Sequence, residues 1–418
     1  MQHLDWKRLA IFDGAGVRKL LTSVKIADVC KFADVCEREE RMSIYLDCNA
    51  TTPVDSRVAD AVIRYMTEEF GNAGSRTHEY GTRAKQAVQL ARDRVAVLVD
   101  AARDEIIFTS GATESNNLAI LGLAEHGERT GRKHIISSQI EHKAILEPLE
   151  HLTTKGFDVT LVAPTSGGWI DPACVAKALR KDTLLVSIMH VNNETGVIQP
   201  LAEIANALSD HPSYFHTDAA QGFGKNITTL KIPRIDLISI SGHKIYGPKG
   251  VGALVARRRE LKKIPLKPLF FGGGQERNLR PGTLPVPLIV GIGLAADLAS
   301  KEIAIRTEQN STFKSQLLTA LAPLGPRING DPERVLPTVI NLGFPGLDSE
   351  AVMLVLKNEI SISNGSACTS QNYTPSHVLK AMGLSEENIS GSLRLSWCHL
   401  TPNPNWNNVV MLIKNLRR

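Results

Sequence analysis

A lysine and an aspartate stand at the ends of two predicted strands and could do chemistry together. Lys244 follows the apolar run 236–241, and Asp218 ends the run 214–217. A lysine at the mouth of a sheet loses water around its ammonium group, which lowers its pKa and makes the amine nucleophilic. A nearby carboxylate could pair with a pyridinium nitrogen and keep a cofactor ring protonated. Taken alone, Lys244 is more simply a surface lysine and Asp218 a helix N-cap, but together they indicate a pyridoxal phosphate site.

Other strand ends carry residues that could hold such a cofactor. The segment 108–114 runs from a strand through a glycine turn into a helix, whose first N–H groups suit a phosphate together with the Thr113 hydroxyl. Further candidates are Ser241 and His243 for the phosphate, Gln221 and Asn193 for a ring oxygen, and His142 for stacking on the ring and moving protons. Each also has an ordinary structural interpretation, as a capping histidine, a turn asparagine or a solvated glutamine. Their common position at strand ends favours the cofactor interpretation.

Two residues further along could act on a substrate. Cys368 lies in a Gly/Ser-rich loop from Ser363 to about Ser376, where a thiol is accessible, although free cysteines are usually buried. It is either a reactive or a harmless surface thiol. Arg394 stands in the alternating apolar strand 391–396, and an inward-facing arginine suits the bidentate capture of a carboxylate. The alternative is a surface arginine with only its stem packed.

The elements that would position these residues alternate between helix and strand from residue 60 to about 300. Predicted strands span 105–109, 134–138, 158–163, 184–190, 214–217, 236–241 and 252–256, and predicted helices span 59–66, 83–98 and 117–125. Short buried strands separated by helices indicate an α/β fold with a mostly parallel sheet covered on both faces. Ligands bind such sheets at the carboxyl ends of the strands.

After about residue 300 the pattern changes to that of a smaller α+β domain. It predicts helices at 301–321 and 409–416 and strands at 338–342, 360–363 and 391–396. We therefore expect a large cofactor-binding domain over 54–300 and a small domain formed by 43–53 and 301–418. For residues 1–42, an N-terminal extension, two interpretations stay open: a helical appendage, or a natural start of translation at Met42.

The composition is that of an ordinary globular chain. Of 418 residues, 43% are hydrophobic and 22% charged, with a net charge of +5, which excludes disordered and fibrous classes. No apolar run is long enough for a transmembrane helix, so no membrane partner is expected. The six cysteines form no CxxC pair, which argues against a metal site, and an N-terminus without a signal peptide predicts a cytoplasmic protein with free thiols. The basic run 257–263 suggests nucleic-acid binding as a rival function, but a solvated loop is the simpler interpretation.

Eight motifs, in their order along residues 43–416, resemble those of the cysteine desulfurases of the NifS/IscS type. They are Asp47-Cys-Asn-Ala-Thr-Thr-Pro53, Thr109-Ser-Gly-Ala-Thr-Glu-Ser115, Glu141-His142-Lys143, His190-Val-Asn-Asn-Glu194, His216-Thr-Asp-Ala-Ala-Gln221, Ser241-Gly-His-Lys244, Arg280-Pro-Gly-Thr283 and Gly365-Ser-Ala-Cys368. The resemblance implies a pyridoxal-phosphate enzyme with an aspartate-aminotransferase-like fold, acting as a homodimer. It would convert L-cysteine to L-alanine and leave the sulfur as a persulfide on a catalytic cysteine.

The resemblance also implies a role for each matching residue. Lys244 would be the Schiff-base lysine, and Asp218 would pair with the ring nitrogen. His142 would stack on the ring, Asn193 and Gln221 would contact its oxygen, and Ala112, Thr113, Ser241 and His243 would hold the phosphate. Thr283 would reach the partner subunit's phosphate. Arg394, with Asn193, would bind the substrate, and Cys368 would take the sulfur.

Departures from the family pattern bear on the sulfur acceptor. Residues 72–78 lack the usual proline, Pro281 stands where serine is common, and the chain ends soon after Leu416, without a longer C-terminal tail. The motifs at 70–76, 280–285 and 393–397 resemble most the desulfurases of DNA phosphorothioation. We expect a DNA-modifying acceptor. The alternatives are an iron–sulfur scaffold, tRNA thiolation, or selenocysteine lyase activity on the same fold.

Overall fold

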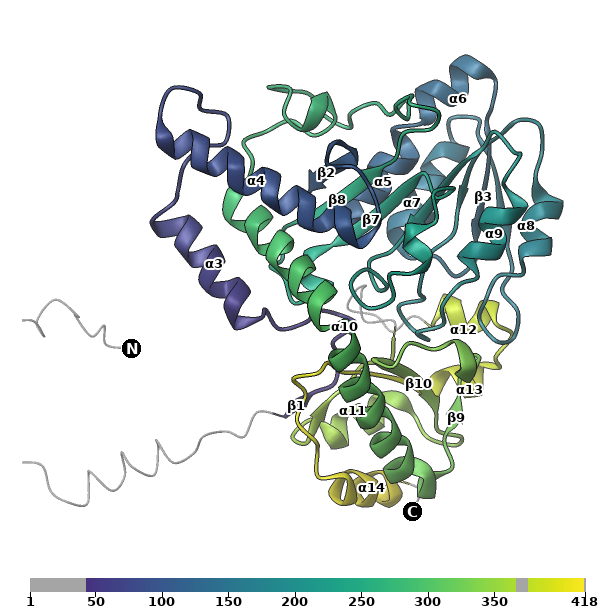
Figure 1. The fold of residues 1–418 in the computed structure, drawn as a ribbon. Helices are drawn as coiled ribbons and strands as arrows, with labels where there is room; N and C mark the ends of the chain where they lie inside the picture. Colours follow the sequence, from purple (N-terminus) through teal and green to yellow (C-terminus); the bar gives the residue numbers. More distant parts are fainter. Residues whose placement is uncertain (1–42, 366–374, 417–418) are drawn as a thin grey trace, which may run out of the picture. The chain divides into compact units, whose positions relative to one another are not determined.

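The computed structural model describes residues 43–365 and 375–416. Figure 1 shows two groups of elements, one around a large sheet and one around a smaller sheet, with the long helix α10 (Val286–Leu321) running through both. Residues 1–42, whose role the sequence left open, lie outside the described residues, and so does Cys368. No helix in the described ranges is long and apolar enough to cross a membrane.

The large sheet is mostly parallel, as the sequence predicts. In the described residues it has seven strands in the order β2-β8-β7-β6-β5-β3-β4. Only β8 runs antiparallel to its neighbours, β7 and β2. These two reversals cancel, so β2 points the same way as β7 and its carboxyl end joins the same edge. The strands are β2 (Ile106–Thr109), β3 (His134–Ser138), β4 (Asp158–Val162), β5 (Thr183–Ser187), β6 (Tyr214–Asp218), β7 (Leu237–Ser241) and β8 (Gly252–Ala256).

Successive residues of these strands pack on opposite faces of the sheet, because side chains alternate along a strand. On β2, Ile106 and Phe108 belong to one buried cluster and Ile107 to the other. The first cluster includes residues of α3 (Ser56–Thr67), α4 (Glu79–Leu98), α8 (Pro172–Ala178), α9 (Leu201–Ala207) and the first half of α10. The second includes residues of α5 (Ala112–Leu121) and α7 (Lys143–Thr153), with the short α6 (Ala124–Thr130) beside it. Both faces are therefore covered, which requires the nearly continuous apolar strands seen in the sequence.

The smaller sheet is antiparallel, with the order β12-β10-β9 in the part of the chain that is described. Its strands are β9 (Arg327–Ile328), β10 (Val339–Gly343) and β12 (Ser392–Ser396). A separate parallel pair joins β1 (Ile44–Tyr45) to β11 (Ile360–Ser361), so the residues just after Ser43 pack with C-terminal elements. The surrounding helices are α11 (Ser349–Leu356), α12 (His377–Ala381), α13 (Glu386–Ser390) and α14 (Trp406–Asn415). The domain boundaries themselves stay a prediction.

Helix α10 begins 15 residues earlier than the predicted helix at 301–321. Its first half is buried on several sides, so it lacks the one-sided apolar stripe by which a surface helix is recognised. Gly291 and Gly293 also lower its helix propensity. Both glycines are needed for packing: a Cβ on Gly293 would lie 2.5 Å from Ala91 on α4, and one on Gly291 would lie 2.8 Å from Val62 on α3. Close packing against α3 and α4 therefore explains the two glycines, which lower the helix propensity and kept the first half of α10 from being predicted.

The first residue of the basic run after β8, Arg257, is buried in the fold, whereas Lys262 and Lys263 are exposed, as expected of a solvated loop. Arg257 is only 6% exposed, and its four hydrogen bonds within the described chain all go to backbone carbonyls: those of Ile232, Ile235, Val99 and Leu230. Burial lowers the pKa of its guanidinium from the usual range.

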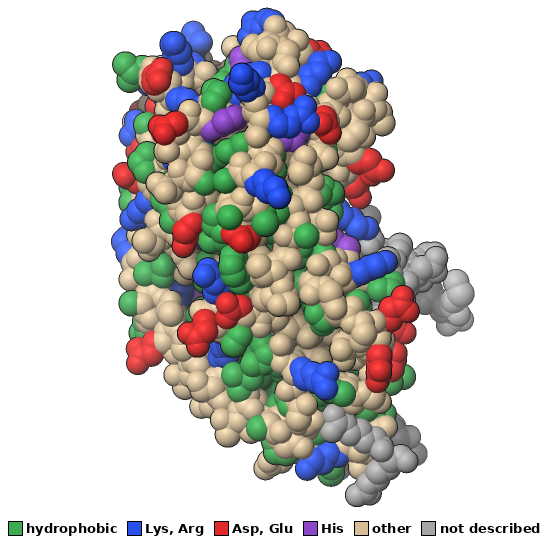
Figure 2. Space-filling view, turned by 90° about the vertical axis from the view of Figure 1, so that its right-hand side faces the viewer, with side chains coloured by type: hydrophobic (Ala, Val, Ile, Leu, Met, Phe, Trp, Pro, Cys, Tyr) green, Lys and Arg blue, Asp and Glu red, His purple; other side chains and the backbone are tan. Residues whose placement is uncertain are grey.

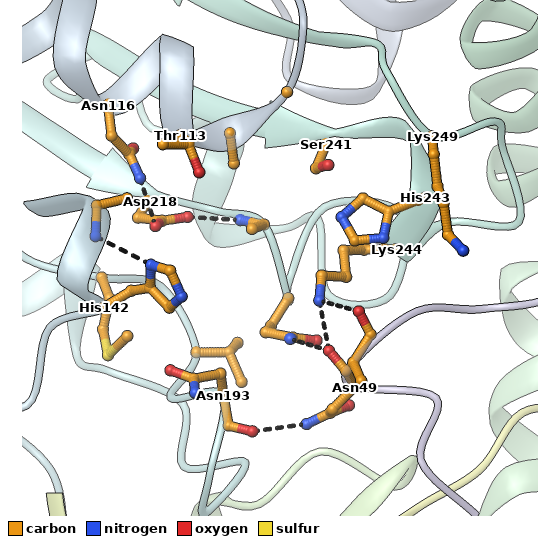
Figure 3. Close-up of a pocket in the computed structure, with 18 of the residues that line it drawn as sticks. Asn49, Thr113, Asn116, His142, Asn193, Asp218, Ser241, His243, Lys244 and Lys249 are labelled. Atoms are coloured by element: carbon orange, nitrogen blue, oxygen red, sulfur yellow. Dashed lines mark hydrogen bonds between the residues drawn. The ribbon is translucent and has the colours of Figure 1, made fainter. Parts of the chain in front are cut away.

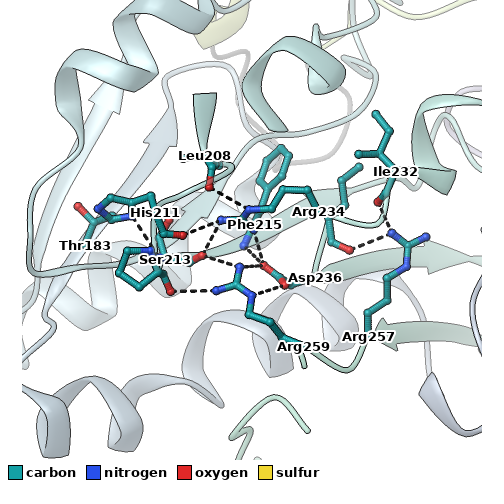
Figure 4. A network of polar contacts seen from close by, with 12 residues as sticks. Thr183, Leu208, His211, Ser213, Phe215, Ile232, Arg234, Asp236, Arg257 and Arg259 are labelled. Carbon is teal, nitrogen blue, oxygen red and sulfur yellow. Dashed lines mark hydrogen bonds and ion pairs between the residues drawn. The ribbon is translucent and has the colours of Figure 1, made fainter. Parts of the chain in front are cut away.

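The next two arginines, Arg258 and Arg259, form ion pairs. Arg259 and Arg234 both pair with Asp236 at 2.8 Å, as Figure 4 shows, while Arg258 pairs with Asp104. Figure 2 shows positive and negative side chains interspersed on the face in view. The three arginines of the run are therefore held by partners within the chain, whereas its two lysines are exposed.

We expect Arg257→Met to lower the free energy of unfolding by at least about 2 kcal/mol, because each buried polar group left unsatisfied costs about 1–3 kcal/mol. Urea denaturation followed by circular dichroism measures it. The matched control is Arg258→Met, next in the chain but 40% exposed in its side chain. It should cost less than about 1 kcal/mol, as exposed ion pairs do. Equal losses in the two variants would show that the carbonyl contacts of Arg257 contribute nothing special.

Candidate active site

Residues predicted from separate motifs line one cavity at the carboxyl-end edge of the large sheet. The cavity has a volume of about 370 Å³, and Figure 3 shows it from close by. The predicted residues that line it are Ala112, Thr113, His142, Asn193, Asp218, Gln221, Ser241, His243, Lys244 and Arg394. Thr283 is exposed and is not among the residues that line this cavity.

Asp218 lies at the last position of β6 and is 6% exposed. Its Oδ2 accepts a hydrogen bond from the Asn116 side-chain amide at 2.7 Å, and its Oδ1 accepts one from the Ala220 N–H at 2.9 Å. The second bond is the capping contact considered from the sequence, so Asp218 caps the turn while also facing the cavity. Asn116, fully buried on α5, was not predicted. It stands one turn after Thr113, and this helical spacing was the available signal.

Lys244 reaches the cavity from the short 3₁₀ turn Gly242–Lys244 that follows β7. Its Nζ donates to the Asn49 carbonyl at 2.5 Å and to the Ala50 carbonyl at 2.7 Å. Gln221 Nε2 donates to the same Asn49 carbonyl at 2.9 Å, while the Asn49 amide donates to the Asn193 carbonyl at 3.1 Å. Asn49 thus joins three predicted residues. No role was predicted for Asn49, although it lies in the motif 47–53.

The side of the cavity beside α5 offers hydrogen-bond donors of the kind that an anion needs. The first turn of α5 begins at Ala112, and Thr113, Ser241 and His243 line the same region (Figure 3). Burial, helped by neighbouring ammonium groups including that of Lys244, lowers the pKa of His243 to about 4. His243 is therefore neutral near pH 7, and its Nδ1 lies 3.1 Å from the Thr51 hydroxyl.

His142 has the capping role that the sequence left open and also lines the cavity. It is the N-cap of α7, where its Nδ1 accepts a hydrogen bond from the Ala144 N–H at 3.1 Å. Because Nδ1 accepts, the proton of a neutral ring sits on Nε2. The ring lies in the cavity opposite Lys244 (Figure 3). The helix cap therefore fixes the orientation of the ring in the cavity.

Arg394 faces inward from β12 and is 3% exposed, so the surface interpretation was wrong. Its Nη2 pairs with Asp47 Oδ1 at 2.6 Å, and its Nη1 donates to the Asn193 carbonyl at 3.1 Å. Its Nε is buried without a hydrogen-bond partner among the described residues. Asp47, which the sequence did not single out, orients the guanidinium at the cavity wall.

Glu194 lies close to described residues on both sides of the segment 366–374, which contains Cys368. Its Oε2 accepts a hydrogen bond from the Ser376 hydroxyl at 2.5 Å. A Cβ built on Gly365 would lie 3.1 Å from the same oxygen, so Gly365 approaches it closely. Burial raises the pKa of the Glu194 carboxyl. This residue was part of the motif 190–194 but was assigned no role.

Glu141, next to His142, is a fully buried carboxyl group. Its Oε1 accepts hydrogen bonds from the Ser138 hydroxyl at 2.6 Å and the Met189 N–H at 2.9 Å, which ties the ends of β3 and β5 together. Burial raises its pKa from 4.5 to about 8, despite these two bonds. The group is therefore mostly protonated near pH 7.

We expect Glu141→Gln to flatten the pH dependence of stability. A folded-state pKa above the unfolded value gives stabilisation that is full below about pH 4.5 and is lost as the pH rises through about 8. The wild type should lose up to about 1.4 kcal/mol per pH unit in this window relative to the variant. Urea denaturation between pH 5 and 8 measures the difference. Glu147→Gln, which changes an exposed residue of the following helix α7, should follow the wild type. A slope unchanged in Glu141→Gln would contradict the assignment.

Comparisons with known proteins agree on one family. The class-V aminotransferase model matches residues 44–405. The chain is 44% identical to cysteine desulfurase IscS of Vibrio cholerae over 377 residues, 90% of this chain and 92% of that protein. It is 57% identical to the crystal structure of DndA from Streptomyces lividans, with a TM-score of 0.75 over 85% of this chain and 98% of that one. With SspA in complex with cysteine it shares 38% identity, with a TM-score of 0.76 over 86% of this chain and all of that one.

Proposed function

The chain belongs to the class-V aminotransferase family, and on this basis we propose that it is a pyridoxal-phosphate-dependent cysteine desulfurase. It converts L-cysteine to L-alanine and transfers the sulfur to Cys368 for delivery to an acceptor. The observation that carries the proposal is one cavity that brings together a lysine amine, a buried carboxylate and a buried arginine. These groups come from Lys244, Asp218 and Arg394.

The residues present fit pyridoxal phosphate. Lys244 Nζ would bind the aldehyde, and Asp218, across the cavity, would pair with the ring nitrogen. The Oε1 of Gln221 is buried and has no hydrogen-bond partner within the described chain, an orphan that a ring hydroxyl would satisfy. His142 would stack on the ring, and Asn193 would contact its oxygen.

The phosphate binds at the start of α5. Backbone N–H groups at Ala112 and Thr113 and the positive end of the helix dipole favour an anion there. The Ser241 hydroxyl and the neutral His243 ring add donors. A neutral histidine donates one hydrogen bond to an anion without placing a further positive charge next to Lys244.

Arg394 binds the substrate carboxylate. The guanidinium is already held by Asp47 and by the Asn193 carbonyl, so little side-chain entropy is lost when the substrate binds. Its buried Nε keeps an unused N–H for the incoming carboxylate. A lysine at this position could not make the planar two-bond contact.

The reaction removes sulfur from the β-carbon of the substrate. When bound, pyridoxal phosphate supplies an electron sink that stabilises negative charge at the substrate α-carbon. His142 and Lys244 line the same cavity, and their imidazole and amine would be the groups of this chain that move the α-proton. The Cys368 thiolate attacks the substrate sulfur, an S–S bond forms, and the C–S bond breaks with the electron pair leaving on carbon, where a proton is added. Cysteine and one thiol thus give alanine and one persulfide.

We expect Lys244→Ala to lose the absorption band of the covalently bound cofactor and to form no alanine from cysteine. The reason is that no other amine takes its place opposite Asp218. Lys249→Ala, which removes an exposed lysine at the rim of the same cavity, should keep the band and most of the activity. Absorption spectra of the purified proteins, followed by alanine and sulfide assays, separate the two. A cofactor band retained in Lys244→Ala would refute the assignment.

We expect Cys368→Ser to keep the cofactor band but to form no protein persulfide. Wild type incubated with cysteine should carry one extra sulfur on the Cys368 peptide, removable by reductant. Mass spectrometry after alkylation locates it. Cys174→Ser, which removes an exposed thiol on α8, serves as the control and should still become persulfidated. Extra sulfur on another cysteine would overturn the role of Cys368.

The enzyme acts as a cytoplasmic homodimer and delivers its sulfur to a DNA-modifying enzyme. The exposed position of Thr283, away from the cavity of its own chain, supports a contact with the partner's phosphate. The DNA-modifying acceptor is supported by the motifs at 70–76, 280–285 and 393–397. The identity with DndA, 57% against 44% with IscS, supports it further.

We expect deletion of the gene to remove phosphorothioate from the host's DNA, because the modification would then lack its sulfur donor. Nuclease digestion and mass spectrometry of the nucleotides measure it. Complementation with wild type should restore the modification, whereas Cys368→Ser should not. If the modification persists in a strain without another desulfurase, sulfur goes to a different acceptor and the desulfurase activity alone remains.

A further inference from the structure

Two buried cysteines outside the proposed chemistry lie next to each other behind the cavity. Cys48 follows β1, and Cys398 follows β12. The Cys48 N–H donates to the Ser396 carbonyl at 3.0 Å, and the Asn49 N–H donates to the Ser396 hydroxyl at 2.9 Å. These bonds hold the two segments side by side although 350 positions separate the cysteines in the sequence. With Tyr246 they form a separate small buried cluster, in which the cysteines are 2% and 4% exposed.

The two side chains belong to one buried cluster, and the surroundings favour a thiolate on Cys398. The Thr401 hydroxyl donates to Cys398 Sγ at 3.5 Å, and the Leu400 N–H also contributes. The adjacent Cys48 thiol and these donors lower the pKa of Cys398 to about 6, while the pKa of Cys48 is raised. Cys398 is therefore the member of the pair that loses its proton first.

Lys225 provides a positive charge near this pair. Burial lowers the pKa of its ammonium group to about 8, and the charges that favour the ammonium form come from Cys48 and Cys398. A partly buried lysine needs a counter-charge, and here the thiolate supplies it. A thiolate beside a thiol is the arrangement that forms disulfides most readily.

We propose that Cys48 and Cys398 are a redox-active dithiol that closes to an intramolecular disulfide when the protein meets hydrogen peroxide. The Cys398 thiolate attacks one peroxide oxygen, so an S–O bond forms, the O–O bond breaks, and the leaving hydroxide takes up a proton to become water. Cys48, as thiolate, then attacks that sulfur, the S–S bond forms, and the second oxygen leaves as water. Two thiols and one peroxide give one disulfide and two waters. The small oxidant suits a pair that is almost fully buried.

The position of the pair connects it to the cavity. Cys48 stands between Asp47, which orients Arg394, and Asn49, whose carbonyl accepts from Lys244. A disulfide bond is about 2.0 Å long, much shorter than a hydrogen bond between two sulfur atoms, so closing it draws Cys48 and its two neighbours toward β12. Oxidation at this pair therefore reaches two contacts of the cavity without any change at Cys368.

The test is peptide mapping of the full chain, and it does not depend on what reaction the protein catalyses. Reduced protein is treated with hydrogen peroxide, unfolded in an alkylating agent, digested and examined by mass spectrometry. We expect the peptides containing Cys48 and Cys398 to be linked, two hydrogens lighter than their sum, and separable by dithiothreitol. Exposed Cys174 is the internal reference for oxidant exposure.

Variants show whether the partner is specific. Cys48→Ser and Cys398→Ser should each abolish the linked peptide and leave the remaining thiol to oxidise further, whereas Cys174→Ser should leave the link unchanged. Thermal unfolding of each variant checks that it is folded. If Cys48 and Cys398 are both still alkylated as free thiols in the wild type when Cys174 is fully oxidised, the pair is an inert buried contact and the proposal is wrong. A link from either residue to a different cysteine would also overturn it.

Discussion

The carbonyl oxygen of Asn49 is the point on which the geometry of the cavity depends. It accepts hydrogen bonds from Lys244 Nζ at 2.5 Å and Gln221 Nε2 at 2.9 Å, so two groups from adjacent strand ends converge on one backbone atom. A backbone carbonyl is a rigid acceptor because the peptide plane is fixed by its neighbours. Here the fixing comes from β12, through the Ser396 hydroxyl and the Asn49 N–H. The reactive amine on the large sheet is thus aimed by a strand of the small sheet.

The same strand supplies Arg394, so one element sets both the anion-binding group and the acceptor that orients the lysine. Helix α10 packs against both sheets and so helps to hold them in place. Its first half packs in the core beneath the large sheet, and its second half, with Phe313 and Leu317, packs in the core of the small sheet. A continuous helix transmits position over many turns because each turn is hydrogen-bonded to the next. The cavity therefore sits between two cores that are covalently and rigidly connected.

The sequence predicted those parts of the fold and site that have a local signal. The seven strands of the large sheet, five helices in whole or in part, and the strand-end positions of Lys244 and Asp218 follow from local patterns of apolar and polar residues, whereas α7, α8, α9, α11, α12 and α13 were not predicted. It missed Asn116, Asp47 and Asn49, because their importance lies in contacts with residues more than a hundred positions away. The burial of Arg257 was missed for a related reason. A charged side chain is stable inside only where several carbonyls converge on it, and that arrangement exists only in the folded chain.

Several residues were hard to interpret because a capping role and a position at the cavity occur together in them. His142 caps α7 through Nδ1 and faces the cavity through the rest of its ring, and Asp218 receives a turn N–H on one oxygen and Asn116 on the other. The structural bond is what makes the chemical role possible. A histidine held at Nδ1 has one tautomer and one orientation, and a carboxylate bonded to a turn and to a buried amide cannot rotate away from its ligand. Strand ends followed by helix starts provide such bonds at little cost, since the first N–H groups of a helix need acceptors in any case. The ordinary capping role therefore supports the catalytic interpretation at these positions.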